Sequence, residues 1–373
     1  MTVQIRFGVN VVIIVEERSG SRIAETPSKI IWVDPRTDTT WSHLVNRLSG
    51  SVFHSPDWIR VLADTYGWNP SALVVIGDSG EPVAGVPFIH VSDVLGDRAV
   101  ALPFSDYCDP LVTDKTTWRL LSDRLLEKGC RINLRCLRNA LPLEDERFST
   151  VRQAKWHALD LRPDTESLWR EIDDSAQRAI RKSLREGIRL RVAQCEKELR
   201  TFFEMHLKVR KYKYGLFAQP YTFFQNIWRH FVKKGHGFLL LAVKEDKILA
   251  GDFFLEWNGT LYYKFNASFA EDLLLRPNDL LIWEAIQRGK SRGFATLDFG
   301  LSDWDQEGLV RYKRKFGVEE GTISFLHHEP DGAPPMNNEV REILSKVTRT
   351  FTDHRVPDSM TELAGGFLYK HFV

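Results

Sequence analysis

Cysteine and net charge are both scarce in this sequence. Its 373 residues include only four cysteines, and none forms a CxxC pair or a zinc-ligand spacing (Cys108, Cys130, Cys136 and Cys195). A chain this poor in cysteine does not depend on disulfides, so we expect reduced thiols in a cytoplasmic protein. The formal net charge of +1 argues against stable DNA binding through overall charge, although a local basic patch remains compatible with it.

Long apolar runs are also missing. No stretch approaches the roughly 18 uncharged apolar residues of a membrane helix, so we expect no membrane span. Val11–Val15 is apolar, but Glu16 and Glu17 follow directly, which predicts a strand rather than a signal peptide. His327 and His328 are adjacent and would point to opposite faces of a strand, so we expect no metal site.

The main positive feature is an internal repeat. A chain of 373 residues is long for one compact core, so two domains are expected. Two segments, around Gly85 and Gly251, each read as an apolar run, a polar turn and a second apolar run that opens with Ala-Gly. Short apolar runs joined by turn residues predict a β-hairpin in each segment.

The similarity extends on both sides of the hairpins. Each hairpin follows an amphipathic helical pattern and precedes a strand, a helix that ends at glycine, and a further strand. The matching pairs are Ser55–Tyr66 with Tyr221–Lys233, Ala99–Phe104 with Leu261–Asn266, Thr117–Gly129 with Asn278–Gly293, and Arg131–Leu137 with Ala295–Leu301. This order predicts two α/β units with mixed central sheets. We place them at residues 1–150 and 151–330, followed by a helical tail at 331–373.

The order of elements and several motifs resemble the GNAT acyltransferase fold in the tandem form of the FemAB family. The segments that carry the resemblance are RAIRKSLREGIRLR (178–191), RKYKYG (210–215), PNDLLIWEAI (277–286), LDFG (297–300), GLVRYKRKFG (308–317) and, less specifically, LPFSDYCDP (102–110). The resemblance implies two tandem GNAT-like domains, of which the second carries the active site.

The resemblance also implies a function. It indicates an N-acyltransferase that moves an acyl or aminoacyl group from acyl-CoA or aminoacyl-tRNA to an amine of a cell-envelope or polysaccharide-related precursor, with no tightly bound cofactor. A small-molecule, glycan or peptide precursor is the implied acceptor, tRNA is a possible partner, and the oligomeric state stays open. Two alternatives remain: a nucleic-acid-binding module without catalysis, and a pseudoenzyme that retains the fold.

Two departures bear on the donor. The tRNA-dependent ligases often carry a long helical hairpin in the second unit, and no heptad run of that length is present here. CoA-binding GNAT enzymes usually hold the pyrophosphate with a glycine-rich loop, where backbone N–H groups face the anion. The corresponding stretch, Phe269–Pro277, has no glycine and two acidic residues, so the usual CoA cradle is absent.

Lys313 and Asp298 are the candidate catalytic residues. Amide formation needs a neutral amine, a stabilised oxyanion and a proton for the leaving group. The resemblance matches Lys313 to the lysine of a Phe-Lys pair that serves the reaction in tRNA-dependent ligases. We expect Lys313 on a strand, with Arg314 on the opposite face. Asp298 would accept the amine proton, although an exposed strand lysine and a turn carboxylate are the structural alternatives for the two residues.

The candidate substrate-binding residues fall in four segments. Four cations at helical i, i+3, i+4 and i+7 spacing share one face and could contact phosphate, or simply form a solvated face: Arg178, Arg181, Lys182 and Arg185. In the first unit, which we expect to be non-catalytic, Asp106 and Tyr107 would face the acceptor. The remaining candidates come from the second unit: Arg210, Lys213, Asn278, Asp303 and Tyr312.

Overall fold

The computed structural model describes residues 29–333 and 338–373, so the strand expected at Val11–Val15 lies outside the described residues. The elements of the first unit, in chain order, are β1 (Lys29–Val33), α1 (Thr39–Arg47), η1 (Val52–His54), α2 (Pro56–Tyr66), β2 (Pro70–Ile76), β3 (Pro82–Asp93), β4 (Gly96–Val100), α3 (Lys115–Leu126) and β5 (Arg131–Cys136).

The second unit repeats this order with additional helices before its hairpin. Its elements are β6 (Ser149–Asp160), α4 (Thr165–Glu171), α5 (Asp174–Arg185), β7 (Arg189–Val192), α6 (Glu196–Lys208), η2 (Val209–Lys213), α7 (Tyr221–His230), η3 (Val232–Lys234), β8 (Gly237–Lys244), β9 (Lys247–Trp257), β10 (Thr260–Ser268), η4 (Ala270–Leu275), α8 (Pro277–Ser291), β11 (Thr296–Ser302), α9 (Glu307–Arg314) and β12 (Glu319–His328). The tail contains α10 (Asn338–Thr352), α11 (Asp358–Leu368) and η5 (Tyr369–His371).

The repeat predicted from the sequence is confirmed. β2–β3 and β8–β9 are antiparallel hairpins, and α3 and α8 each lead into a strand that runs parallel to its neighbour. The Ala-Gly pairs have a packing reason: a Cβ on Gly85 would lie 2.8 Å from the Leu73 carbonyl oxygen, and one on Gly251 would lie 3.0 Å from both Leu241 and Phe202. Side chains pack directly against the backbone at these two points.

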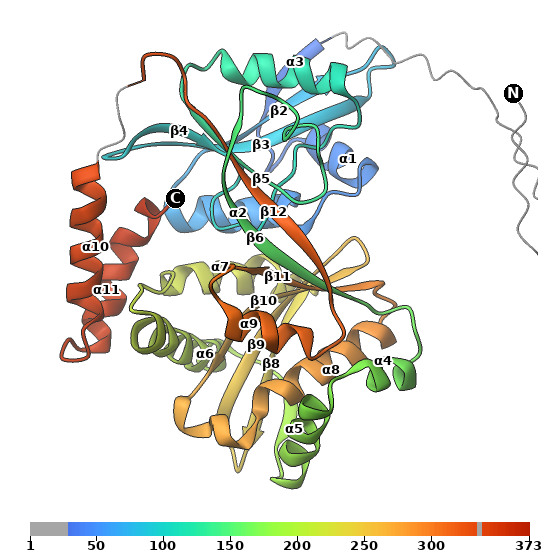
Figure 1. Cartoon of the computed structure of the whole chain (residues 1–373), viewed down its shortest axis with the longest axis vertical. Coiled ribbons are helices and arrows are strands. Elements are labelled where there is room, and N and C mark those ends of the chain that lie inside the picture. The colour runs from blue at the N-terminus through green and yellow to red at the C-terminus, as the bar shows by residue number, and fades with distance from the viewer. Residues whose placement is uncertain (1–28, 334–337) are drawn as a thin grey trace, which may run out of the picture.

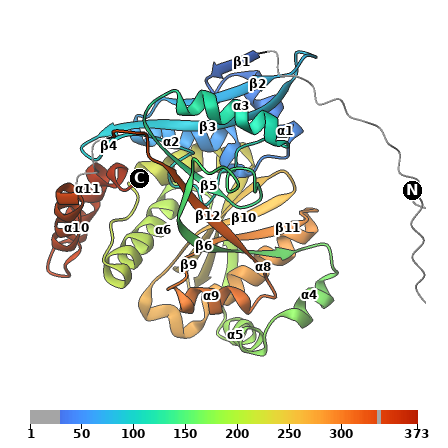
Figure 2. The ribbon, with the colours of Figure 1, turned by 45° about the horizontal axis from the view of Figure 1, so that its top comes forward.

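The two units share one continuous sheet of 12 strands. Its order is β1-β2-β3-β4-β5-β12-β6-β11-β10-β9-β8-β7. The long antiparallel pair β6–β12 crosses the middle of the molecule in Figures 1 and 2, and β12 also pairs with β5. A strand late in the chain therefore closes the sheet between the two units. The boundaries at 150 and 330 stay predictions, because β6 begins at Ser149 and spans the first of them.

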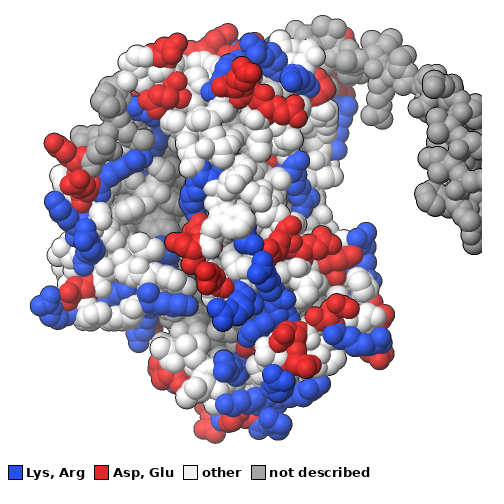
Figure 3. All heavy atoms as spheres, in the orientation of Figure 1, with Lys and Arg blue, Asp and Glu red and all other residues white. Residues whose placement is uncertain are grey.

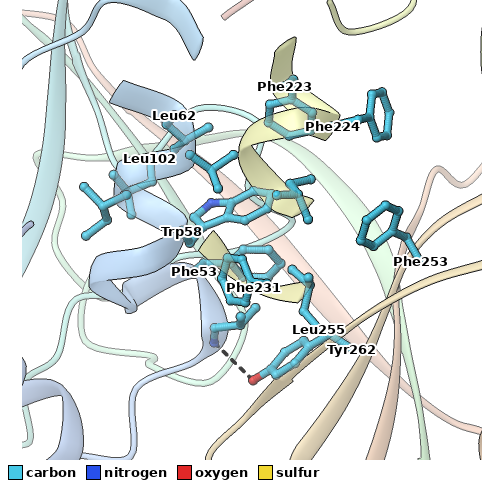
Figure 4. Packing of buried hydrophobic residues seen from close by; sticks show 14 of the residues in the cluster. Phe53, Trp58, Leu62, Leu102, Phe223, Phe224, Phe231, Phe253, Leu255 and Tyr262 are labelled. Carbon is cyan, nitrogen blue, oxygen red and sulfur yellow. Dashed lines mark hydrogen bonds between the residues drawn. The ribbon is translucent and has the colours of Figure 1, made fainter. Parts of the chain in front are cut away.

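The two units also share a hydrophobic core. Equivalent helices α2 and α7 pack against each other, and Figure 4 shows Phe53 and Trp58 of the first unit among Phe223, Phe253 and Tyr262 of the second. Polar contacts reinforce the helix pair: Asn226 Nδ2 donates to Thr65 Oγ1 at 3.0 Å, and His230 Nε2 lies 2.8 Å from Asp64 Oδ2.

The C-terminal helices predicted from the sequence are present and pack beside α6. Lys211 ties them to the second unit, because its buried ammonium donates to the Val356 carbonyl and to Asp358. All four cysteines are free. Among the described helices, none combines the length and the apolar composition needed to cross a bilayer.

One local prediction was wrong. The segment around Lys313 is not a strand but the helix α9, and it buries Val310 and Lys313 at i, i+3 spacing. Apolar and basic residues alternate in this segment, which is typical of a strand. The pattern is misleading because Lys313 occupies a buried position of the helix, where an apolar residue is usual. The helical period becomes visible only when Lys313 is counted as an inward-facing residue.

Candidate active site

The site lies where β10 and β11 stop pairing. These parallel strands are in register only from Thr260 to Tyr262, opposite 296–298. Beyond this point β10 has a bulge between Tyr263 and Phe265, and β11 shifts register against β6 between Asp298 and Gly300. Bulges re-aim side chains and open the ladder. β10 and β11 therefore separate near the centre of the continuous sheet, and polar side chains lie in the gap between them.

Asp298 is held by partners from three parts of the chain. Its Oδ2 accepts hydrogen bonds from the Tyr107 hydroxyl at 2.8 Å and from Trp156 Nε1 at 3.0 Å, and its Oδ1 accepts from the Gly300 N–H at 2.7 Å. It is 2% exposed. Burial raises the pKa of Asp298 above its usual value, and these donors oppose that shift. The first unit is thus fastened to the active-site strand through Tyr107.

Asp106 and Lys264 form the ion pair at the junction of the units. Lys264 Nζ donates to Asp106 Oδ1 at 2.6 Å, and its ammonium also lies 4.8 Å from the centre of the Phe53 ring. The bulge in β10 supplies Lys264. The other Asp106 oxygen lies only 2.5 Å from where a Cβ of residue 300 would be, and Gly300 has a φ of +67°. Glycine at this position therefore lets the carboxylate of one unit lie against the strand of the other.

Lys313 is buried beside this pair. Its ammonium donates to the carbonyl oxygens of Gly300 at 3.1 Å and Leu301 at 2.9 Å, and the residue is 3% exposed. Burial lowers the pKa of Lys313 to about 8, and the carboxylates of Asp106 and Asp298 oppose that shift. The amine is therefore close to the pKa range that suits proton transfer near neutral pH.

The four basic residues on α5 do share a face, as the spacing predicts. Arg178, Arg181 and Arg185 are exposed and Lys182 is half-buried. Arg181 donates to Gln177 Oε1 at 2.9 Å and lies over the Trp169 ring. Figure 3 shows basic side chains interspersed with acidic ones over the second unit. The phosphate-binding role of this face stays a prediction.

The remaining candidates do not converge on one point. Asp303 pairs with Arg152 of β6, and Arg210 Nε donates to the Phe217 carbonyl at 3.0 Å. Lys213 is exposed, with its ammonium over the Tyr214 ring. Asn278 and Tyr312 lie instead beside buried groups on the α8 face of the sheet. The structure thus brings Asp106, Tyr107, Asp298 and Lys313 together and leaves the others outside that group.

Sequence reasoning missed Lys264, Trp156 and His157. His157 of β6 is opposite Gly300 in the sheet, and neither ring nitrogen has a hydrogen-bond partner in the described structure. Burial, with a further effect from nearby Lys313, lowers the pKa of His157 to about 4. None of the three lies in a recognisable motif. Only the pairing of β6 with β11 and the bulge in β10 could have pointed to them.

A cavity of about 400 Å³ opens between the units next to this site. Both units line it, with Ser51, His54, Asp109 and Arg138 from the first and Asn258 and Tyr262 from the second. Tyr107 lines the cavity too, while its hydroxyl binds Asp298. The cavity wall and the Asp298 network are therefore directly connected.

Comparison with known proteins agrees with this architecture. Residues 173–314 match the model of the acetyltransferase (GNAT) domain. The fold is similar to that of FemX, with a TM-score of 0.60 and 14% identity over 84% of this chain and 99% of that chain. It is also similar to a tandem GNAT protein from the clavulanic acid biosynthesis pathway, with a TM-score of 0.54 and 12% identity over 82% of this chain and 99% of that one.

A third similar structure is L-PGS from Bacillus licheniformis, with a TM-score of 0.51 and 13% identity over 85% of this chain and 97% of that chain. No curated protein matches the sequence. At these identities the structural likeness establishes the fold alone, and the domain match places a GNAT acetyltransferase domain at residues 173–314, so the chain is an acyltransferase. Its tandem arrangement is similar to those of FemX and of the tandem GNAT protein.

Proposed function

We propose that this chain transfers an acyl or aminoacyl group from an activated donor to an amine of a cell-envelope or polysaccharide-related precursor, at the junction of its two units. The observation that carries this proposal is the Asp106–Lys264 pair, in which each unit supplies one residue, placed beside Lys313 in the gap between β10 and β11. The FemAB resemblance of the sequence supports the class of acceptor.

The proposed chemistry uses the groups in the order that amide formation requires. Asp106 is half-buried and can accept the proton of the acceptor amine. When the tetrahedral intermediate collapses, the bond from the acyl carbon to the donor oxygen or sulfur breaks, and Asp106 can return this proton to the leaving oxygen or sulfur. Lys313 has three N–H donors and directs two of them to backbone carbonyls, which leaves one for the oxyanion of the tetrahedral intermediate. Lys264 holds Asp106 in place and adds positive charge beside the reacting carbonyl. Asp298 is enclosed by donors, so we assign it to positioning Tyr107 and the Gly300 turn.

The proposal also covers the donor, which is an aminoacyl-tRNA or an acyl-CoA, and the location of the protein, which is the cytoplasm. The loop before α8 is the turn η4 followed by Arg276, and it offers no glycine for a pyrophosphate. This favours an aminoacyl donor, or an acyl-CoA held in another way, over the usual CoA cradle. Both donors are cytoplasmic metabolites, and the free state of all four cysteines supports a cytoplasmic location. The acceptor would occupy the cavity between the units.

The test combines donor binding with turnover. A true donor should raise the melting temperature of the full chain by mass action, so acetyl-CoA and aminoacyl-tRNA are compared first. With the donor identified, Lys313→Met should lower turnover by roughly 10²–10³ with little change in donor affinity, because one oxyanion donor is removed. Circular dichroism checks that the variant is folded, since two carbonyls lose their partner.

Arg314→Met is the matched control. Arg314 is the next residue on α9, is exposed, and pairs only with Glu320 among the described side chains. Its removal should leave turnover nearly unchanged. Equal losses in both variants, or full activity in a folded Lys313→Met protein, would refute the role given to Lys313.

A further inference from the structure

A second group of polar side chains is buried on the α8 face of the sheet. Asp252 on β9 and Asn266 on β10 are directly opposite in register. Asn266 Nδ2 donates to Asp252 Oδ1 at 2.6 Å and to Asn278 Oδ1 at 3.3 Å, which reaches the first turn of α8. Asp252 shares this face with Ala250 and Phe254, which pack under α8. The group is thus separate from the Asp106–Lys264 pair, which packs against Phe53 and Trp58.

Several oxygen atoms in this group have no hydrogen-bond partner. Asp252 is fully buried, and its Oδ2 has no hydrogen bond among the described residues. Asp279 Oδ1, which has Lys315 Nζ at 3.8 Å, and the Tyr312 hydroxyl likewise make no hydrogen bond. Tyr312 packs against the same apolar cluster as Ala250 and Phe254, which flank Asp252 on its strand face, and both carboxyl groups lie close enough to Tyr312 to add to the rise in its pKa that burial causes. Unpartnered buried polar groups are costly and need an explanation.

The repeat shows that the fold itself does not need a carboxyl group here. In the first unit Ala84-Gly85 is followed by Val86, whereas in the second Ala250-Gly251 is followed by Asp252. Val86 is completely buried in an apolar cluster. The same hairpin therefore forms around an apolar side chain, and the second unit has an acid at the equivalent place. Burying a carboxyl group without a partner costs free energy, and the first unit shows that the fold does not require it. We therefore infer that Asp252 binds a ligand.

The chemistry of these three oxygen atoms, none of which makes a hydrogen bond, indicates the kind of ligand. Two are carboxylate oxygens, which accept hydrogen bonds when ionised, and the third is a hydroxyl that can also accept. A primary ammonium group has three donors, no acceptor and the opposite charge. An anion would face two acids. The neighbouring cation Lys315 lies 3.8 Å from Asp279 and gives Asp252 no contact. Tyr263, Asn266, Asn278 and Tyr312 are each half-buried, so the group lies close to the surface of the second unit.

We propose that Asp252, Asn266, Asn278 and Tyr312 form a binding site for a primary ammonium group of a substrate. Two sources share this chemistry: the amino group of an aminoacyl donor, and a second amine of the acceptor. That the bound amine belongs to a substrate rests on the proposed acyl transfer. Binding of the ammonium group itself is an independent claim.

The experiment measures binding of small probes to the full chain by ligand-observed NMR. Alaninamide mimics an aminoacyl group, lactamide replaces its ammonium by a hydroxyl, and 1,4-diaminobutane represents an acceptor amine. We expect an ammonium probe to bind and lactamide to bind at least tenfold more weakly. Preference for alaninamide identifies the donor as the source, and preference for the diamine identifies the acceptor. Equal binding of alaninamide and lactamide, or binding of neither ammonium probe, overturns the proposal.

Three variants locate the site. Asp252→Asn keeps the shape and the Asn266 contact, and should weaken binding of the ammonium probe roughly tenfold or more, because an amide, unlike the Asp252 carboxyl group, cannot lose a proton to form a charged partner for the ammonium group. Tyr312→Phe removes only the hydroxyl and should weaken it severalfold. Glu256→Gln is the control: it lies on the same strand face, but its carboxylate is already paired with Arg292. Unchanged binding in Asp252→Asn, or equal loss in Glu256→Gln, overturns the assignment.

The outcome is distinguishable from failure of the proposed function. Probe binding requires no donor and no turnover. If an ammonium probe binds through Asp252 but no amine is acylated, acyl transfer at the Asp106–Lys264 centre fails and the ammonium site stands. If acylation occurs while Asp252→Asn retains full affinity and turnover, acyl transfer stands and the ammonium site is wrong.

Discussion

At the scale of single residues, two buried carboxyl groups of the second unit differ in their hydrogen-bond partners. Asp298 and Asp252 are both almost inaccessible, yet they differ in their surroundings. Asp298 accepts three hydrogen bonds, whereas Asp252 accepts one from Asn266 and has a free oxygen. Burial accordingly raises the pKa of Asp252 to about 8. Asp298 is therefore suited to a structural role, whereas Asp252 is suited to binding a positively charged group of a ligand.

Asp252 gives a prediction about stability and pH. Its pKa in the folded protein is about 8, against 3.8 for the unfolded chain, so between these values only the folded state keeps the proton. The contribution of Asp252 to the free energy of unfolding therefore falls as pH rises, by at most about 1.4 kcal/mol per pH unit, and levels off above pH 8. Asp252→Asn removes this dependence.

Urea unfolding of both proteins at pH 5, 6, 7 and 8 measures the effect. The variant should gain stability relative to the natural protein at each step. A difference that is constant from pH 5 to pH 8 would mean that Asp252 is ionised throughout and already has a cationic partner.

At the scale of elements, α5 combines an anchored face with a basic one. Ser183 is fully buried and donates to the carbonyls of Leu275 and Arg276, just before α8. The helix is therefore fixed to the loop that precedes α8, with Arg181 and Arg185 directed to solvent.

We predict that replacing Arg181 and Arg185 together by Gln weakens binding of a polyanionic donor. The slope of log affinity against log salt should also become flatter, by nearly one for each phosphate that is no longer neutralised by an arginine. Affinity measured from 50 to 200 mM salt checks both effects.

The matched control for α5 is Arg119→Gln with Arg124→Gln on α3 of the first unit, which makes the same change in net charge on exposed helical residues. Identical effects of the two double variants would indicate a general charge effect, and the absence of any effect would make the α5 stripe a solvated face.

At the scale of the whole molecule, the two units are not independent bodies. β12 completes the sheet between β5 and β6, and the largest apolar core contains residues of both units. Trp58 shows the coupling: its ring packs edge-on against Phe223 at 5.9 Å, and its Nε1 donates to Ser105 at 2.8 Å. The site between the units depends on this shared core to hold Asp106 against β11.

Trp58→Ala should therefore destabilise both units together, by about 3–5 kcal/mol. Hydrogen exchange should show protection falling in β3 and in β9 alike. Trp304→Ala is the control, because Trp304 is 52% exposed and its replacement should change stability by at most about 0.5 kcal/mol. Loss of protection confined to β3 would show that the units unfold separately.

The sequence alone determined the repeat and most elements, because these depend on local patterns. The two hairpins, α2, α3, α7 and α8 follow from apolar periodicity and from terminal glycines such as Gly129 and Gly293, both with positive φ. Free cysteines and a mixed sheet were also expected and found. The FemAB-like order of motifs indicated the fold and the class of enzyme before any contact was known.

Only the tertiary structure decided how the site is composed. Lys264 reaches Asp106, 158 residues away in sequence, through a bulge that no local pattern marks. Lys313 lies on a helix because packing against β11 turns it inward, although the sequence suggested a strand. Asp252 occupies the position of Val86 in the repeat. Only the structure shows that one of its carboxyl oxygens is buried without a hydrogen bond, which is the observation that suggests a binding site. Local periodicity sets the elements, whereas long-range pairing and burial set which polar groups meet and which are left without a partner.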